Sequence, residues 1–204
     1  MTRIIAGLAR GARLEVPSSG TRPTSDRVRE SLFGALEAMD AVADARVLDL
    51  YAGSGALGLE ALSRGATSAD LVERGRQAAA IVRRNAALVA KASASTAEFA
   101  TRSTEPIARV HESAVQTFLA RASGPYDLVF TDPPYDIEDA AMNADLVALA
   151  PSLSPDAVVV VERAKRATTP DFAAAGLESF RQKTYGDTIL WWAAPQPTTE
   201  SQSR

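Results

Sequence analysis

The sequence predicts an α/β fold in which a mostly parallel sheet is covered by helices on both faces. From residue 46 onward, apolar runs of strand length alternate with segments whose apolar residues recur at helical spacing. Two further strand-like runs, 177–183 and 188–192, flank Tyr185-Gly186-Asp187 and indicate a closing antiparallel pair. With 204 residues, 46% of them hydrophobic, the chain can bury one core and carry a small appendage.

The expected elements follow in chain order. A hairpin pairs 3–8 with 12–16. A helix then begins with Thr24 as its N-cap, and Asp26 in its first turn is favourable to the helix dipole. Its apolar residues, from Val28 to Met39, recur at helical spacing. We then expect strands over 46–50, 68–73, 106–110, 127–131 and 157–162, and helices over 55–64, 77–90, 115–122 and 139–150. Residues 91–105, rich in Ala, Ser and Thr, indicate a flexible connection or an insertion.

One turn carries a chemical signal. Asp132-Pro133-Pro134-Tyr135 follows directly after an apolar strand, and the two prolines end that strand abruptly. Ligands of open α/β sheets bind at the carboxyl ends of the strands. The carboxylate and nearby carbonyl groups could accept N–H bonds from a flat amine while Tyr135 stacks on its face. A strand-ending turn with a chance tyrosine is the alternative.

A glycine loop follows the first strand of the alternating region. Gly53, Gly55 and Gly58 match G-x-G-x-x-G, a pattern that lets the backbone approach a ligand and enter a helix. Asp49, upstream of the loop, would repel a pyrophosphate but suits a cationic ligand such as an α-amino group or a sulfonium. Glu73 ends the next strand, where a carboxylate commonly binds ribose hydroxyls. The implied ligand is S-adenosyl-L-methionine.

Composition and charge exclude several classes of protein. The chain has no cysteine, which rules out disulfides, thiolate metal sites and a cysteine nucleophile. We expect no metal. We also expect no membrane partner, since no apolar run approaches the roughly 18 residues of a membrane helix. The start shows no secretory h-region, so a soluble, cytoplasmic protein is expected. Residues 1–30 carry six arginines against three acids, whereas the whole chain has a net charge of −3, which suggests a polyanion-facing arm on an acidic body.

These residues carry a family resemblance. The chain resembles the bacterial small-subunit rRNA guanine-N2 methyltransferases of the RsmD type in six blocks: 3–7, 22–33, 48–60, 61–66, 132–135 and 185–188. The resemblance implies a Rossmann-like class I methyltransferase with a seven-stranded mixed sheet, its last strand antiparallel, over 41–195. It implies an RNA-facing extension over 1–40, and we expect a disordered tail over 196–204. The implied substrate is one guanine N2 amine in 16S rRNA of assembling 30S particles, and we expect a monomer.

The resemblance also assigns site residues. It implies that Asp132, Pro133, Pro134 and Tyr135 are catalytic. The implied cofactor-binding residues are Asp49, Tyr51, Ala52, Gly53, Ser54, Gly55, Leu57, Gly58, Glu73, Arg74, Glu112, Ser113, Ala114 and Asp132. The implied RNA-binding residues are Arg3, Arg10, Arg13, Arg22, Arg27 and Arg29. The family usually has an aspartate where this chain has Ala114, so adenine recognition there rests on backbone groups or on Glu112.

Two alternatives stay open. One is an amino-methyltransferase acting on DNA adenine N6 or protein glutamine N5, although many such enzymes carry Asn at the position of Asp132. The other is an NAD-dependent oxidoreductase or a nucleotide-binding module, which would explain the glycines but neither Asp49 nor the Asp132–Tyr135 turn. His111 is interpreted as a loop residue rather than a catalytic base. Trp191 and Trp192 are placed in an edge-like strand, where packing explains at least one of them.

Overall fold

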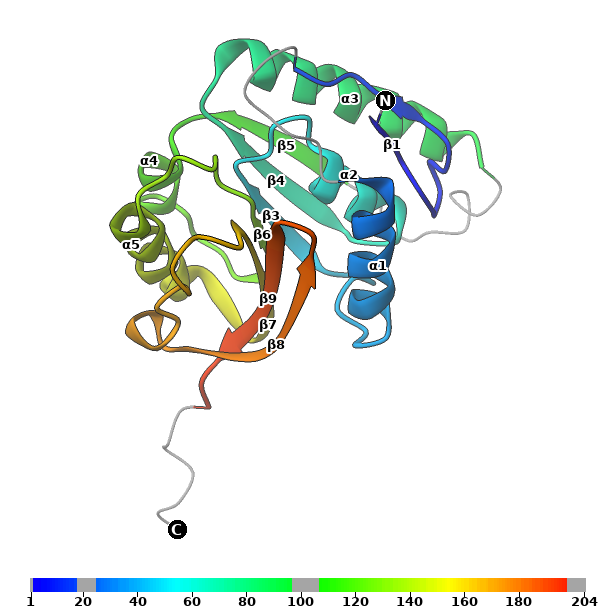
Figure 1. Cartoon of the computed structure of the whole chain (residues 1–204). Coiled ribbons are helices and arrows are strands. Elements are labelled where there is room, and N and C mark those ends of the chain that lie inside the picture. The colour runs from blue at the N-terminus through cyan, green and yellow to red at the C-terminus, as the bar shows by residue number, and fades with distance from the viewer. Residues whose placement is uncertain (1, 18–24, 97–106, 198–204) are drawn as a thin grey trace.

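The computed structural model describes residues 2–17, 25–96 and 107–197, and its centre is a seven-stranded sheet in the order β5-β4-β3-β6-β7-β9-β8 (Figure 1). Within these residues β9 alone runs against the other strands of this sheet, pairing antiparallel with both β7 and β8. The strands are β3 (Arg46–Leu50), β4 (Ser68–Glu73), β5 (Ile107–Glu112), β6 (Tyr126–Thr131), β7 (Leu153–Ala164), β8 (Leu177–Tyr185) and β9 (Thr188–Pro195). The predicted mixed α/β sheet is confirmed.

Helices cover both faces of the sheet, with α1, α2 and α3 on one side and α4 and α5 on the other (Figure 1). Their bounds are α1 (Asp26–Glu37), α2 (Ala56–Ser63), α3 (Arg76–Ala94), α4 (Val115–Leu119) and α5 (Asp139–Leu149), with short 3-10 turns at Ala150–Ser152 and Ala173–Ala175. Side chains alternate along each strand, so Val47 and Leu128 pack toward the first group of helices. Leu48 and Val129 pack toward the second.

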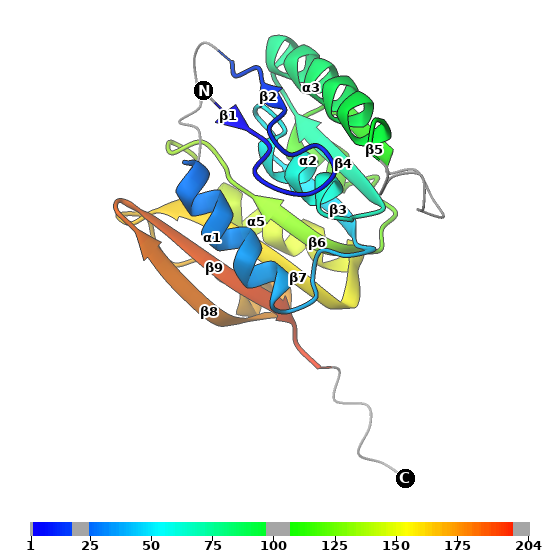
Figure 2. The ribbon, with the colours of Figure 1, turned by 90° about the vertical axis from the view of Figure 1, so that its right-hand side faces the viewer.

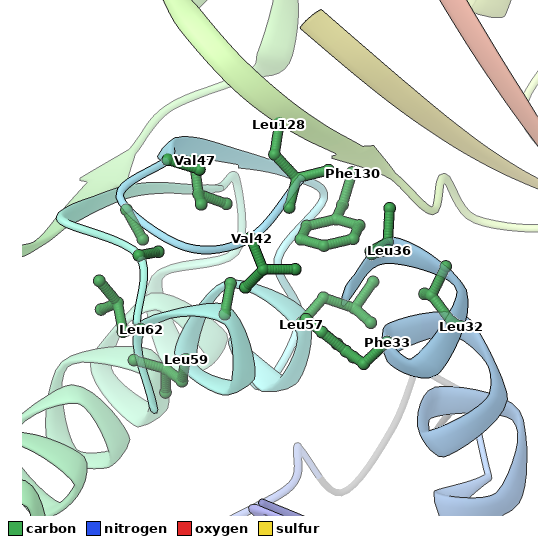
Figure 3. Close-up of a cluster of buried hydrophobic side chains, with 14 of the residues drawn as sticks. Leu32, Phe33, Leu36, Val42, Val47, Leu57, Leu59, Leu62, Leu128 and Phe130 are labelled. Carbon is green, nitrogen blue, oxygen red and sulfur yellow. The ribbon is translucent and has the colours of Figure 1, made fainter. Parts of the chain in front are cut away.

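Helix α1 belongs to the main hydrophobic core. Its buried side chains Leu32, Phe33 and Leu36 point toward the sheet (Figure 3). The rings of Phe33 and Phe130 lie 5.7 Å apart, within the range of favourable aromatic pairs. The N-terminal extension therefore shares one core with the sheet.

The N-terminal hairpin is shorter than predicted, because β1 (Thr2–Arg3) and β2 (Arg13–Leu14) pair over two residues each. Ile4 still bonds across the hairpin to Ala12 and Gly11, at 2.9 Å each, but residues after it bond to α2. The amides of Ile5 and Ala6 donate to the buried carboxylate of Glu60, at 2.7 and 3.0 Å. Beyond Ile4, this long-range anchor takes the place of the longer hairpin ladder that the sequence pattern predicts.

Three local expectations need correction. Ser25, not Thr24, accepts the capping bond from the amide of Val28, at 3.3 Å, and Thr24 lies outside the described residues. Helix α3 continues to Ala94, so the start of the predicted 91–105 insertion is helical, and 97–106 lie outside the described residues. His111 lies in strand β5, where its ring contacts Phe118 and its Nε2 lies 2.6 Å from Asp70.

The two tryptophans are also placed differently from the prediction. Strand β9 lies between β7 and β8, so it is an inner strand and β8 forms the edge. Trp191 and Trp192 are both buried, on opposite faces of the sheet. Packing therefore accounts for both rings.

Candidate active site at the carboxyl edge of the sheet

Four predicted site segments meet at one edge of the sheet. Strands β5, β4, β3 and β6 are parallel neighbours, so their carboxyl ends lie side by side. The loop 51–58 follows β3, Glu73 ends β4, 112–114 follow β5, and 132–135 follow β6. The chain turns in opposite directions from β3 and β6, which makes the gap between them the switch point where α/β proteins bind ligands.

The glycine loop follows a backbone path that side chains would obstruct. Tyr51, Gly53 and Gly55 have φ angles of 63°, 57° and 76°, in the left-handed region. A Cβ at Gly55 would lie 3.1–3.2 Å from Val82, Leu59 and Leu71. The loop therefore turns tightly from β3 into the first turn of α2.

Asp49 is a buried carboxylate at the base of this loop. It is 2% exposed, and its Oδ2 accepts a 2.9 Å bond from the amide of Gly58. Burial, with a smaller contribution from the nearby charge of Glu73, raises the pKa of Asp49 to about 7, although the bond from Gly58 favours the carboxylate. Two carboxylates placed this way suit a cationic ligand, whose charge would offset their repulsion.

Leu57 and Gly58, which the sequence predicts as cofactor-binding, contribute to packing at the base of the loop. The side chain of Leu57 lies in the core (Figure 3). A Cβ at Gly58 would lie 2.9 Å from Leu71 and 3.2 Å from Asp49, so this glycine lets α2 pack close to the sheet.

Glu73 holds the neighbouring loops in place. Its Oε2 accepts from the amide of Gly53 at 3.1 Å, and its Oε1 accepts from that of Gly75 at 2.6 Å. Its own carbonyl accepts from Ser113 at 3.1 Å, which links the ends of β4 and β5. The exposed Arg74 follows at the rim.

Ala114, at the position where the family usually has an aspartate, lies just after the end of β5. This residue is the N-cap of α4 and supplies no side-chain cap, whereas an aspartate there would offer an acceptor. Glu112 is partly exposed and pairs with Arg83 at 3.4 Å. The polar groups near this strand end are thus the Ser113 backbone and hydroxyl and the carboxylate of Glu112.

The turn 132–135 presents an aromatic ring to solvent. Pro133 is buried, Asp132 is partly buried, and Tyr135 is 47% exposed with its hydroxyl 3.5 Å from Oγ1 of Thr188. The amide of Ile137 donates to the carbonyl of Pro134 at 3.1 Å and closes the turn. The Tyr135 ring is therefore exposed for stacking, on a turn whose backbone is constrained.

Arg163 supports this turn, although no sequence pattern marked it. Its buried guanidinium donates to Asp139 at 2.6 Å and to the Ile137 carbonyl at 3.4 Å. Arg163 lies in β7, the strand next to β6, so it secures the loop from the adjacent strand. Only the tertiary fold brings these positions together.

A second unpredicted group supports the glycine loop. The hydroxyl of Tyr51 donates to the buried Asp145 of α5, which also accepts from Gln116 at 2.7 Å. Burial raises the pKa of both Tyr51 and Asp145. On the opposite side of the loop, Asn85 donates to the carbonyl groups of Ser54 and Glu15, at 2.8 and 2.9 Å.

The N-terminal arginines differ in their surroundings. Arg29 is 1% exposed and donates to the Arg3 carbonyl and to Asp26, so it is a structural residue and not the RNA contact that was predicted. The side chain of Arg3 also pairs with Asp26, at 3.3 Å. Arg10, Arg13 and Arg27 are exposed, and Arg22 lies outside the described residues.

Comparison with known proteins agrees with the fold and the family. The family described as Conserved hypothetical protein 95 matches residues 2–194. Ribosomal RNA small subunit methyltransferase D of Escherichia coli (strain K12) is 44% identical over 134 residues, which are 65% of this chain and 60% of that protein. The chain thus aligns with less than two thirds of that relative's length. The protein of the same name from Haemophilus influenzae is 36% identical over 165 residues, covering 80% of this chain and 79% of its own.

Solved structures of methyltransferases have the same fold. The putative methyltransferase yhhF from Escherichia coli superposes with a TM-score of 0.75 at 33% identity, covering 97% of this chain and 99% of its own. Magnesium protoporphyrin IX methyltransferase from Synechocystis PCC 6803, solved with bound SAM, shares the fold with a TM-score of 0.61 at 15% identity, covering 83% of this chain and 79% of its own.

The sheet order, the glycine loop and the four strand ends define a class I methyltransferase fold. The chain belongs to the Conserved hypothetical protein 95 family, the RsmD-type family that the sequence blocks implied. Among the helices that the structure describes, none is long and apolar enough to cross a membrane.

Proposed function

We propose that the protein is an S-adenosylmethionine-dependent methyltransferase that modifies the exocyclic N2 amine of one guanine in 16S rRNA of assembling small subunits. The observation that carries this proposal is the placement of the turn 132–135 beside the glycine loop at the β3–β6 switch point. A donor on the loop and an acceptor amine on the turn would then be neighbours. The names of the family members support rRNA as the substrate.

The residues present fit the cofactor. S-adenosylmethionine would supply a methyl group activated on a sulfonium. We assign its cationic amino-acid end to Asp49 and the loop 51–55, and its ribose hydroxyls to Glu73. A carboxylate oxygen can accept further hydrogen bonds beside those from Gly53 and Gly75. The adenine would meet the Ser113–Ala114 backbone or Glu112, with Arg74 at the rim.

The acceptor turn would prepare a weak nucleophile. The lone pair of guanine N2 is delocalised into the ring. Asp132 and the Pro133 carbonyl, accepting its N–H bonds, would favour a more pyramidal nitrogen, and Pro134 would keep the turn stiff. Holding the two reactants in line is worth on the order of 7–11 kcal/mol. Stacking on Tyr135 would add roughly 1–3 kcal/mol to base binding.

The RNA would approach from the side of the N-terminal extension. We assign Arg3, Arg10, Arg13 and Arg27 to phosphate contacts that position the RNA without reading its sequence. The target base must be unstacked or already splayed out, because its N2 amine is not accessible to the turn within a duplex. We propose that the enzyme works as a monomer in the cytoplasm, where small subunits assemble.

Asp132→Ala tests the acceptor role. We expect methyl transfer to 30S particles that lack the modification to fall about 100-fold or more, with S-adenosylmethionine affinity retained. The measurement is radiolabel transfer, followed by mass mapping of methylguanosine in the 16S rRNA. Asp136→Ala, which removes an exposed carboxylate from the same loop, is the matched control. A near-parent rate for Asp132→Ala would refute the assigned role.

The same preparations separate the alternatives. Transfer to DNA or to a protein, but not to the particles, would favour another amino-methyltransferase. Stabilisation against heat by NAD, but not by S-adenosylhomocysteine, would favour an oxidoreductase, because only a true ligand of the folded state raises the melting temperature by mass action.

A further inference from the structure

A second concave site lies next to the acceptor turn. A cavity of about 520 Å³ is lined by Tyr135, Ala164, Lys165, Arg166 and Asp187. Its walls come from the turn after β6, the end of β7 and the turn between β8 and β9. Because β6 and β7 are parallel neighbours, this cavity opens at the same edge of the sheet as the candidate active site. Its volume is within the roughly 300–1,000 Å³ of small-ligand sites.

The walls of the cavity are held together by hydrogen bonds. The amide of Lys165 donates to the Asp187 carbonyl at 2.7 Å, and Ala164 pairs with Thr188 in the β7–β9 ladder. The Tyr135 hydroxyl lies 3.5 Å from Oγ1 of the same Thr188. On the far side, the β8–β9 hairpin lies beside α1 (Figure 2), where the Tyr185 hydroxyl donates to Ser31 at 2.7 Å. The site is therefore preformed.

The charges of the cavity favour a phosphate group. Lys165 and Arg166 are both exposed, and neither forms an ion pair with any residue that the structure describes. This separates them from Arg3 and Arg29, which are paired with Asp26. Among the described residues of the lining, Asp187 is the one acid, and its carboxylate can accept from a base amine or a ribose hydroxyl.

We infer that this cavity binds the RNA backbone at the target nucleotide, with Lys165 and Arg166 each contacting one of the flanking phosphates while the base lies against Tyr135. This inference rests on the proposed function. Tyr135 lines the cavity and lies in the same turn as Asp132, so a base that stacks on Tyr135 with its amine at Asp132 would have the two cations of the cavity beside it. Single-stranded RNA sites combine a cationic groove with an aromatic platform in this way.

The test compares the double variant Lys165→Gln/Arg166→Gln with Arg121→Gln. Arg121 is an exposed cation just after α4, where the chain has returned toward the amino edge of the sheet, so its loss removes charge without touching the cavity. Binding of unmodified 30S particles is measured over a salt series. We expect roughly tenfold weaker binding for the double variant and a salt slope lower by roughly 1 to 1.5, because each lost phosphate contact reduces the slope by about 0.7.

The outcomes distinguish this inference from the proposed function. S-adenosylhomocysteine affinity and the melting temperature should match the parent in all variants, since the substituted side chains are exposed. The charge-preserving swap Lys165→Arg/Arg166→Lys should restore most of the binding. If the double variant binds with the same slope as Arg121→Gln while the parent methylates the particles, the cavity assignment is wrong and the proposed function stands. If the parent transfers no methyl group, both are wrong.

Discussion

Asp49 is a buried side chain whose ionised carboxylate would bind the cationic end of the cofactor. Its pKa of about 7 lies well above the ordinary value of 3.8, mainly because burial disfavours the carboxylate. Between these two values the folded protein holds a proton that the unfolded chain has released. The stability that this group contributes is therefore fully present below about pH 4 and is lost as the pH rises through about 7.

Cofactor binding should follow the opposite trend. We expect the affinity for S-adenosylmethionine to increase between pH 5.5 and 7.5 as Asp49 ionises, because the cationic ligand favours the carboxylate. Asp49→Asn should bind more weakly at pH 7.5 and lose this dependence, which titration calorimetry at several pH values would measure. Asp127→Asn, at the amino end of β6, should keep the parent profile. An unchanged pH profile in Asp49→Asn would contradict the assignment.

Residues of the site differ in how far the sequence could predict them. Asp49, Glu73 and Asp132 were predictable as part of the strand-end pattern, because each lies in or directly after a recognisable strand. Arg163 and Asn85 were not, since their partners lie 24 to 70 positions away and only the folded chain brings them together. The many arginines around Arg29 indicate an exposed basic arm, but composition does not determine which of these arginines is buried and hydrogen-bonded within the fold.

At the scale of elements, the parallel strands were the most predictable. The bounds of β3 and β4 match the prediction because both are apolar runs bounded by loops. The N-terminal hairpin was predicted too long, because its middle residues bond to α2, which no local pattern indicates. The end of α3 was missed because Ala-rich and Ser-rich sequence is compatible with both helix and loop.

Two glycines of the extension provide a matched test of its docking. Gly7 and Gly11 have φ angles of +78° and +86°. A Cβ at Gly7 would lie 1.9 Å from the Ser63 carbonyl oxygen, whereas a Cβ at Gly11 would have no atom of the described residues within 4 Å. Gly11→Ala should lower the free energy of unfolding by about 1 kcal/mol, through backbone strain alone. Gly7→Ala should cost about 3 kcal/mol or more, since the backbone of α2 must also move.

Chemical denaturation of the two glycine variants would measure this difference. The extension is docked on α2 as described only if Gly7→Ala is clearly the less stable of the two. Equal losses would mean that the contact between Gly7 and Ser63 does not hold the extension in solution.

At the scale of the whole molecule, the extension and the sheet should unfold together. Phe33 of α1 is fully buried against Phe130 of the sheet, so the two parts share one core (Figure 3). Phe33→Ala should lower the free energy of unfolding by about 3–5 kcal/mol and keep a single transition. Circular dichroism and tryptophan fluorescence, which report on helices and on Trp191 and Trp192, should give coincident curves. Separate midpoints would show that the extension is an independent unit.

The anchor between the N-terminal residues and α2 also affects the order of events during synthesis. Ile5 and Ala6 are made before their acceptor, Glu60, which follows 54 to 55 residues later in the chain. A two-residue hairpin is not stable alone, so the first segment of the chain must wait without a partner until α2 has emerged. The segment around Ile5 and Ala6 can therefore dock only once α2 has formed, and its docking adds a further constraint on the helix that follows the glycine loop.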